Sequence, residues 1–303
     1  MMRILVTDGM EKSAMAKLVE LGHEVVEQFY PSEELGEALK GFDAVVVRSA
    51  TKVRKEHIDA CQGGALKLVI RGGVGVDNID VAYAEEKGIS VRNTPRASSD
   101  SVAELALGHM FACARFLSIA GHTMREGKWE KKAYGKGIEL GGKILGVIGY
   151  GRIGQSLGAK AQAMGMKVKA YDIFKVESLQ SETMQYVEMD ELLSTCDFIS
   201  VHTPAIDGKP LICAENIAKM KDGVVLVNTS RGNNVDEAAL LDALNSGKIR
   251  GAGLDVFQVE PATNTELLNH PNVSCTPHIG AATQEAQTRI GAEIVDIIEG
   301  FGK

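Results

Sequence analysis

Short apolar runs rich in β-branched residues alternate with segments of helical periodicity along most of the chain. Amphipathic segments such as 12–21 and 81–87 separate these runs. Strands buried in a parallel sheet have this composition, and helices are the usual crossovers between them. In the first part of the chain the pattern predicts strands at 3–8, 23–29, 43–49, 66–73 and 89–95.

One long stretch of helical periodicity, 99–125, follows this first series. Its apolar residues occur on most faces, which predicts a helix packed on two sides. After a polar, glycine-containing link a second series begins, and an amphipathic helix is expected at 284–300. The second series predicts six strands, at 143–149, 167–172, 198–204, 224–230, 251–257 and 273–279.

The two series predict two α/β lobes, each built on a doubly wound parallel sheet. The length of 303 residues fits two domains of ordinary size.

Composition and charge narrow the class of protein. An apolar fraction of 45% and a charged fraction of 24% are those of an ordinary globular protein, and a net charge of −7 argues against a nucleic-acid binder. The five cysteines are scattered without a CxxC pair, so neither a disulfide framework nor a metal site is expected. No signal peptide and no membrane-spanning apolar stretch is found, so we expect a cytoplasmic protein.

The segment "ILGVIGYGRIGQSLG" is the strongest local signal in the chain. Gly149, Gly151 and Gly154 have GxGxxG spacing, follow an apolar strand and open a helix, and the next strand ends at Asp172. In a dinucleotide site the glycines permit a tight turn, close approach of the pyrophosphate and close helix packing, while the acid binds the adenosine ribose. A carboxylate there repels a 2′-phosphate, so NAD is favoured over NADP. A bare match would be weak in a chain with 33 glycines, but this context makes a nucleotide-free glycine turn the minor alternative.

Ligands of parallel α/β sheets lie beyond the carboxyl ends of the strands, so charged and polar residues at those ends are candidates. In the second lobe these are His202 and Thr203 in "HTP", Arg231 in "NTSRG", Asp255 and Glu260 in "DVFQVEP", and His278 in "TPHIG". In the first lobe they are Arg48 in "RSATK" and Arg71 in "IRGGVGVDN".

Each candidate also has an ordinary explanation. Arg231 could be a surface cation beside a helix, Glu260 a solvated turn before proline, and a single histidine is more often structural than catalytic. His278 stands out because its strand-end loop has a proline before it and the small residues "GAAT" after it. His202 is a weaker candidate of the same kind.

Taken together, these motifs resemble the NAD-dependent D-isomer-specific 2-hydroxyacid dehydrogenases, from Arg3 to the C-terminus. The resemblance is strongest to the branch that acts on 3-phospho-D-glycerate. It rests on "VVVRSATKV", "RGGVGVDNID", "NTP" with "SVAE", "GKWE", "GYGRIG", "HTP", "NTSRG", "NNVDEAAL", "GAGLDVFQVEP" and "TPHIGAAT".

The resemblance implies a Rossmann-type NAD-binding domain, residues 98–284, inserted in a flavodoxin-like substrate domain, residues 1–97 and 285–303. It also implies a homodimer through the cofactor domain, with which the apolar stretch 99–125 is compatible.

The resemblance implies that the catalytic residues are Arg231, Glu260 and His278. Histidine can accept and return the proton of the C2 hydroxyl, a neighbouring carboxylate favours its charged form and orients the ring, and arginine pairs with the substrate carboxylate. Asp255 is expected to bind the nicotinamide carboxamide. The residues expected to bind the cofactor are Gly149, Gly151, Arg152, Ile153, Gly154, Asp172, His202, Thr203, Pro204, Thr229, Ser230, Asp255, Gly280, Ala281 and Val74. Those expected to bind the substrate are Arg48, Ser49, Arg71, Gly72 and Gly73.

The expected reaction is NAD-dependent oxidation of 3-phospho-D-glycerate to 3-phosphohydroxypyruvate, the first step of serine biosynthesis. Arg48 and Arg71 would supply positive charge for the phosphate. One alternative is a hydroxypyruvate or glyoxylate reductase on the same scaffold. Another, from a different class, is an NAD(H)-sensing, corepressor-like binding protein.

Overall fold

The computed structural model describes residues 1–205 and 208–302, and it divides into two compact units. The first unit is Met1–Ser98 with Ala281–Lys303, and the second is Ser99–Gly280. The family resemblance implied boundaries at 97/98 and 284/285. The second boundary comes earlier because the residues before the last helix hydrogen-bond to it: Gln287 Nε2 donates to the Ala281 carbonyl over 2.8 Å.

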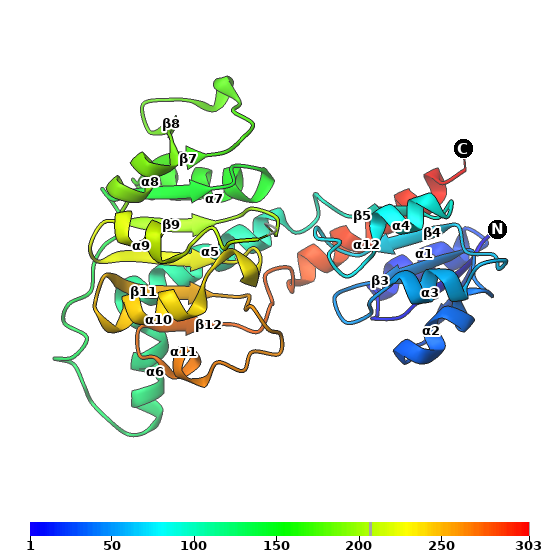
Figure 1. Cartoon of the computed structure of the whole chain (residues 1–303), viewed down its shortest axis with the longest axis horizontal. Helices are drawn as coiled ribbons and strands as arrows, with labels where there is room; N and C mark the ends of the chain where they lie inside the picture. Colours follow the sequence, from blue (N-terminus) through cyan, green and yellow to red (C-terminus); the bar gives the residue numbers. More distant parts are fainter. Residues whose placement is uncertain (206–207, 303) are drawn as a thin grey trace. The chain divides into compact units, whose positions relative to one another are not determined.

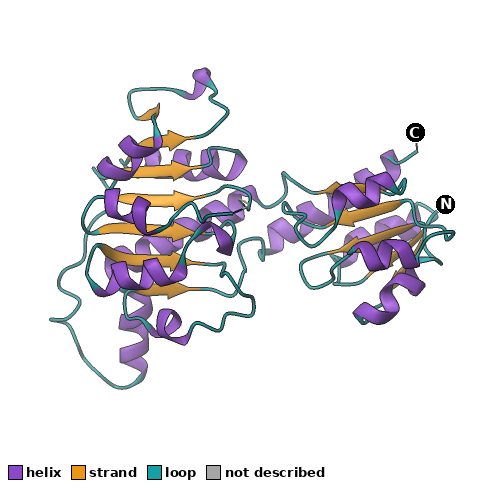
Figure 2. Cartoon of the chain, in the orientation of Figure 1, coloured by secondary structure: helices purple, strands orange, loops and turns teal. Residues whose placement is uncertain are grey.

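The first unit contains a five-stranded, all-parallel sheet in the order β2-β1-β3-β4-β5 (Figures 1 and 2). This is the flavodoxin-like 2-1-3-4-5 order, as expected. The strands are β1 (Arg3–Val6), β2 (Glu24–Glu27), β3 (Ala44–Val47), β4 (Leu68–Arg71) and β5 (Ser90–Asn93).

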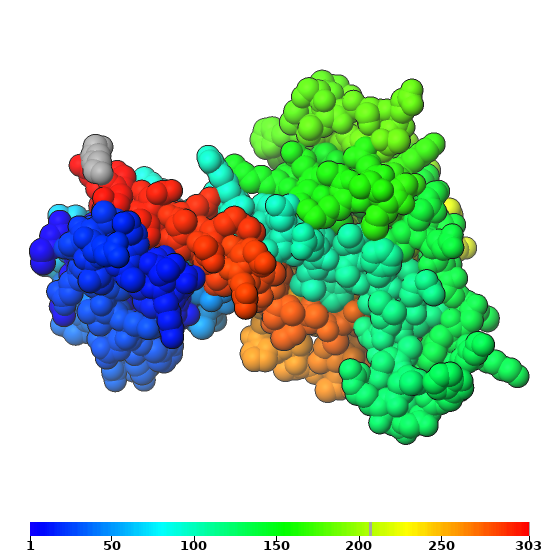
Figure 3. Space-filling view, turned by 180° about the vertical axis from the view of Figure 1, so that it is seen from behind, coloured from blue at the N-terminus to red at the C-terminus, as the bar shows by residue number. Residues whose placement is uncertain are grey.

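Helices cover both faces of this sheet. The helices are α1 (Lys12–Glu20), α2 (Ser32–Leu39), α3 (Lys55–Ala60), α4 (Val81–Glu86) and α12 (Gln284–Gly300). One core cluster joins β1, β3 and β4 to α1 and α12, and the other joins the sheet to α2, α3 and α4. In Figure 3 the red C-terminal helix lies against the blue N-terminal segment. Both ends of the chain therefore build this unit.

The second unit contains a seven-stranded parallel sheet in the order β12-β11-β10-β9-β6-β7-β8. From β8 to β11 this is the Rossmann order 3-2-1-4-5-6, and the direction of winding reverses between β6 and β9. The strands are β6 (Ile144–Ile148), β7 (Lys167–Tyr171), β8 (Met184–Tyr186), β9 (Phe198–Val201), β10 (Val224–Asn228), β11 (Ile249–Leu254) and β12 (Val273–Cys275).

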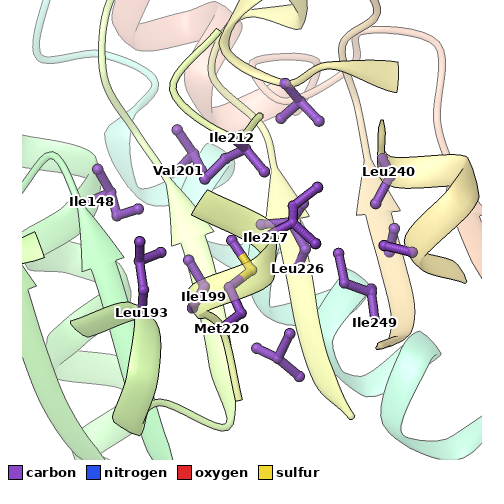
Figure 4. Close-up of a cluster of buried hydrophobic side chains, with 14 of the residues drawn as sticks. Ile148, Leu193, Ile199, Val201, Ile212, Ile217, Met220, Leu226, Leu240 and Ile249 are labelled. Carbon is purple, nitrogen blue, oxygen red and sulfur yellow. The ribbon is translucent and has the colours of Figure 1, made fainter. Parts of the chain in front are cut away.

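Helices again cover both faces. They are α5 (Ser99–Arg115), α6 (Leu117–Arg125), α7 (Arg152–Ala163), α8 (Met189–Thr195), α9 (Ala214–Lys219), α10 (Glu237–Asn245) and α11 (Thr265–Asn269), with 3-10 turns η1 (Glu177–Leu179) and η2 (Gly232–Asn234). Helices α5 and α7 form one core with the sheet. On the other face, α8 to α11 pack on the strands around Ile199, Leu226 and Ile249 (Figure 4).

Two expectations about the second unit are wrong. The sheet has a seventh strand, β8, which was missed because it is a three-residue, partly polar edge strand without readable periodicity. The stretch 99–125 is two helices, because Phe116 adopts a left-handed φ of 59° between them. The axes of these two helices are bent by 67° relative to each other. Among the described residues no single helix is long and apolar enough to cross a membrane. Only this bent pair, taken together, reaches the required length and composition.

The register of the second sheet aligns its carboxyl ends. Ile148 pairs with Tyr171 and Val201, and the same row continues through Asn228 and Leu254 to Cys275. The residues that follow this row begin the loops at the carboxyl edge. They are Asp172, Gly149, His202, Thr229, Asp255 and Thr276.

Candidate active site

The glycine loop connects β6 to α7 at the centre of the carboxyl edge. Gly149 adopts φ +89°, and a Cβ there would lie 2.8 Å from the His202 carbonyl. A Cβ on Gly154 would lie 2.4 Å from the Gly149 carbonyl oxygen, whereas a Cβ on Gly151 would meet no protein atom within 4 Å. Two glycines therefore permit the turn and its packing, and the third leaves open space before the helix.

Arg152 and Ile153 are the first residues of α7, where backbone N–H groups have no carbonyl partner within the helix. This end of a helix attracts anions such as a pyrophosphate. The loop therefore has the backbone form expected of a dinucleotide site.

Asp172 supports the glycine loop from the end of β7. Its Oδ2 accepts from the Tyr150 N–H over 2.6 Å, and its Oδ1 accepts from the Phe174 N–H over 2.9 Å. Each carboxylate oxygen has a second lone pair, which leaves acceptors for ribose hydroxyls. Asp172 can therefore hold the loop and a ribose together.

Two buried polar atoms on the same edge fit an absent ligand. Thr229 Oγ1 and His202 Nδ1 are shielded from solvent and have no hydrogen-bond partner within the described part of the chain. The other ring nitrogen of His202, Nε2, lies 2.8 Å from Ser200 Oγ. Burial lowers the pKa of His202 to about 4. With the open space at Gly151, these atoms are consistent with a bound dinucleotide.

Two asparagines that sequence reasoning missed shape the neighbouring loops. Asn234 is fully buried. Its Nδ2, which has two hydrogens to donate, lies 3.1 Å from Thr203 Oγ1 and from the carbonyl oxygens of Thr203 and Pro204, and 3.2 Å from Ser230 Oγ. Asn228 Oδ1 accepts from the Ser230 hydroxyl over 2.7 Å. Ser230, Thr203 and Pro204 are thus held by hydrogen bonds within the protein. Only the strand-end position of Asn228 could have indicated this, because Asn234 lies in the turn η2.

Glu260 and His278 form a direct pair. His278 Nδ1 lies 2.8 Å from Glu260 Oε2, and the two side chains are 40% and 39% exposed. Burial acts to raise the pKa of Glu260, but the hydrogen bond and charge of His278, the Phe257 N–H and the charge of Arg231 together lower it. The carboxylate is therefore ionised near neutral pH and accepts from Nδ1–H. Nε2 of a neutral His278 then carries the lone pair and can act as a base.

Arg231 stands close to this pair. Its carbonyl accepts from Asn228 Nδ2 over 2.9 Å, and its Nη1 donates to the Ser230 carbonyl over 2.7 Å. The next residue is Gly232, where a Cβ would lie 1.9 Å from the Phe257 carbonyl oxygen. This close approach brings the Arg231 loop against the segment that carries Glu260, so the three residues expected to be catalytic lie in one region of the second unit.

Asp255 is 1% exposed and binds the segment 276–280, called here the His278 loop. Its Oδ1 accepts from the Thr276 hydroxyl over 2.6 Å and from the Ile279 N–H over 2.8 Å. Its Oδ2 accepts from the Gly280 N–H over 2.8 Å. One lone pair on Oδ2 is left, so a contact with a carboxamide remains a prediction beside this role within the protein.

The residues expected to bind substrate lie at the carboxyl edge of the first unit's sheet. Arg48 follows β3, and its backbone N–H donates to Asp8 Oδ2 over 2.7 Å. Arg71 ends β4, and its Nη1 lies 3.3 Å from the Gly72 carbonyl oxygen. Arg48 Cγ lies 3.7 Å from the position that a Cβ on Gly72 would take, so the segments after β3 and β4 are adjacent.

The remaining residues of these sets also belong to the first unit. Ser49 is exposed, and Gly73 is buried at φ +147°. Val74 is exposed, and its carbonyl accepts from Asn93 Nδ2 over 2.5 Å. Ala281 belongs to the first unit and not to the second. Their contacts with ligands remain predictions. Among the described residues no cluster of three or more His, Cys, Asp or Glu side chains could hold a metal ion.

Comparison with known proteins identifies the family. Residues 107–280 match the model of the D-isomer specific 2-hydroxyacid dehydrogenase NAD binding domain. The chain is 50% identical over 301 residues to a hydroxypyruvate reductase of Thermotoga maritima, covering 98% of this chain and 97% of that protein. It is 45% identical over 302 residues to a D-3-phosphoglycerate dehydrogenase of Methanocaldococcus jannaschii, covering 99% of this chain but only 57% of that longer protein.

A solved structure agrees with this assignment. D-lactate dehydrogenase from Aquifex aeolicus, complexed with NAD and lactic acid, superposes with a TM-score of 0.86 at 32% identity, covering 98% of this chain and 95% of that one. The glycine loop, the acid after β7 and the two doubly wound sheets are therefore found in a chain that belongs to the D-isomer specific 2-hydroxyacid dehydrogenases, a family of NAD-dependent oxidoreductases.

Proposed function

We propose that this chain oxidises 3-phospho-D-glycerate with NAD to 3-phosphohydroxypyruvate, the first step of serine biosynthesis, and catalyses the reverse reduction. The observation that carries the choice of substrate is the pair of adjacent arginine-bearing segments, Arg48 and Arg71, at the carboxyl edge of the first sheet. A guanidinium binds phosphate in a bidentate manner, and two of them suit a dianion.

The proposed chemistry uses the second unit's residues as follows. When bound, NAD supplies the acceptor for the hydride that leaves C2 with its electron pair. His278 Nε2 takes the proton of the C2 hydroxyl, so that the C–O bond becomes a carbonyl. Glu260 holds the other ring nitrogen and balances the imidazolium that forms, and Arg231 binds the substrate carboxylate and polarises the C2 oxygen.

A second candidate is reduction of hydroxypyruvate, which lacks the phosphate. The 50% identity to the Thermotoga maritima hydroxypyruvate reductase, over nearly the whole of both chains, favours it. Both candidates use the same proton and hydride transfer, and they differ only in whether a phosphate is bound.

The deciding experiment compares kcat/KM for phosphohydroxypyruvate and hydroxypyruvate with NADH, in the parent enzyme and in Arg48→Gln. We expect the parent to prefer the phosphorylated acid and Arg48→Gln to reduce that preference by roughly tenfold or more, as loss of a charged hydrogen bond implies. Arg92→Gln is the control, since the Arg92 side chain is exposed on β5 and its Nη1 donates to the carbonyl of Val91. A parent enzyme that prefers hydroxypyruvate would establish the second candidate. Tight NADH binding without turnover of any 2-hydroxy acid would favour the corepressor-like alternative.

We also propose that the chain forms a homodimer through its second unit. Helix α6 buries none of its residues within the chain, and Leu117 and Met124 on it are exposed apolar side chains. Sedimentation should give a dimer that Leu117→Glu weakens. Val19→Glu, at an exposed apolar position of α1, should leave it intact.

A further inference from the structure

A buried histidine on α5 is hydrogen-bonded to the segment that carries His278. His109 is 2% exposed, and its ring packs against β11, where a Cβ on Gly253 would lie 2.4 Å from His109 Cβ. Its Nδ1 lies 3.0 Å from Ser274 Oγ, and its Nε2 lies 3.1 Å from Thr276 Oγ1. Glycine at 253 thus lets a polar ring lie between the helix and the strand.

The directions of these hydrogen bonds follow from what each group can do. The backbone N–H groups of Ile279 and Gly280 can only donate, so the Asp255 carboxylate accepts from both. The Thr276 hydroxyl uses its single hydrogen on Asp255 Oδ1 at 2.6 Å. Its oxygen therefore accepts from His109, which places the ring proton on Nε2.

The outer end of the network is consistent with that tautomer. Nδ1 of His109 must accept, and the Ser274 hydroxyl donates to it; Ser118 Oγ, 3.1 Å from Ser274 Oγ, donates in turn. Burial lowers the pKa of His109, although the charge of Asp255 opposes this, so the neutral ring is favoured. Every member of the chain from Ser118 to Asp255 then has a partner of the correct kind.

The inner end of the network determines the backbone beside His278. The Asp255 carbonyl accepts from the His278 N–H over 2.8 Å, and its carboxylate accepts from the next two N–H groups. His278 itself has φ +54°, a left-handed conformation that is costly for any residue with a Cβ. The hydrogen bonds from three successive N–H groups to Asp255 offset that cost and fix the direction of the imidazole.

We propose that His109 and Thr276 are positioning residues, which act through Asp255 to hold the His278 loop so that His278 meets Glu260. The inference rests on the catalytic role proposed above for His278. His109 touches neither substrate nor cofactor in this proposal: it orients the Thr276 hydroxyl, Thr276 orients the carboxylate, and the carboxylate holds the loop.

The test removes the hydroxyl while keeping the shape of the side chain. Thr276→Val should lower kcat by roughly tenfold or more, because small misplacements of a catalytic group are costly, while KM and the Kd for NADH change little. Thr276→Ser, which keeps the hydroxyl, should restore most of kcat. The pH profile of kcat in Thr276→Val should move in the same direction as in Glu260→Gln, because both changes weaken the Glu260–His278 pair.

Four further variants keep the test decisive. His109→Leu should lower kcat as Thr276→Val does. His109→Gln can still donate to Thr276, so its kcat should be higher than that of His109→Leu. These two variants test the proposal even if Thr276→Val does not fold. Ser118→Ala is the matched control, since it removes a hydrogen bond in the same network beyond His109, and it should retain the parent kcat. His278→Ala is measured alongside: normal turnover there would refute the proposed chemistry.

Two results would overturn the positioning proposal alone. One is a parent-like kcat and pH profile in Thr276→Val and His109→Leu together with an inactive His278→Ala. The other is a loss of kcat in Thr276→Val that Thr276→Ser does not restore.

Discussion

The glycine loop and the His278 loop lie on the same edge of one sheet but are built by opposite means. The glycine loop depends on missing side chains, since Gly149 and Gly154 leave no room for a Cβ and Gly151 leaves space for a ligand. The His278 loop depends on side chains that are present, with Asp255, Thr276 and His109 holding its backbone. A binding surface for a cofactor can be made of bare backbone, whereas a group that moves a proton needs its direction fixed.

The largest expected effect separates the two loops by function. His278→Ala should lower kcat at least ~100-fold, the usual contribution of a general acid or base, and leave NADH affinity little changed because the glycine loop is intact. Steady-state kinetics and NADH fluorescence titration measure the two quantities. Lys17→Ala, at an exposed position of α1, serves as control. A kcat within a few-fold of the parent would remove His278 from the proposed chemistry.

The second prediction breaks the glycine loop in two distinguishable ways. Gly154→Ala forces a Cβ against the Gly149 carbonyl and should cost about 1–3 kcal/mol in the free energy of unfolding, as overpacking does. Gly151→Ala meets no protein atom and should leave that free energy unchanged while weakening NADH binding. Urea unfolding and NADH titration of both variants test this, and equal stability losses would show that Gly151 is not open to a ligand.

The third prediction concerns the pair at the tip of the His278 loop. Glu260→Gln keeps the shape of the side chain but removes the charge that balances the imidazolium, so activity should persist with a shifted pH profile. In the reducing direction, where His278 gives a proton, the fall in rate should begin at a lower pH. Measuring kcat from pH 5 to pH 10 tests this, and an unchanged profile would exclude Glu260 from the proton transfer.

The last prediction concerns the pH dependence of stability. Burial lowers the pKa of His202 to about 4, below the ordinary value near ~6.5, so the unfolded chain binds the proton more readily within that window. The free energy of unfolding should therefore fall as the pH drops from ~6.5 towards 4. His202→Gln should flatten this dependence, measured by urea unfolding at several pH values. A slope unaltered in His202→Gln would mean that the ring does not stay neutral.

The same contrast explains what the sequence could predict. The glycine loop is readable because strand, loop, helix and acid follow one another within a short segment, and the folded loop keeps that order. The five strands of the first unit and α12 were also predicted, because each has its own apolar pattern within a short segment. The strand-end rule also pointed to Glu260 and His278, which the structure joins at 2.8 Å.

What sequence reasoning missed depends on contacts between distant segments. The role of His109 could not be predicted from the sequence, because its partners Thr276 and Ser274 come far later in the chain. Strand β8 forms because β7 provides an edge, and α5 ends because Phe116 turns left-handed despite continuous helical periodicity. Asp255 was assigned to the cofactor alone, since nothing in its own motif indicates three donors from another loop.

Helix α12 implies an order of events during synthesis on the ribosome. The second unit, Ser99–Gly280, is continuous, so its core can close as soon as its last strand has emerged. The first unit cannot: Ile290, Ile294 and Ile298 complete the core above Ile4 and Ile70, and they are made only after the second unit. The part of this sheet's face that α1 does not cover therefore stays exposed while the second unit is translated. Apolar surface that is exposed in this way during folding is prone to aggregation.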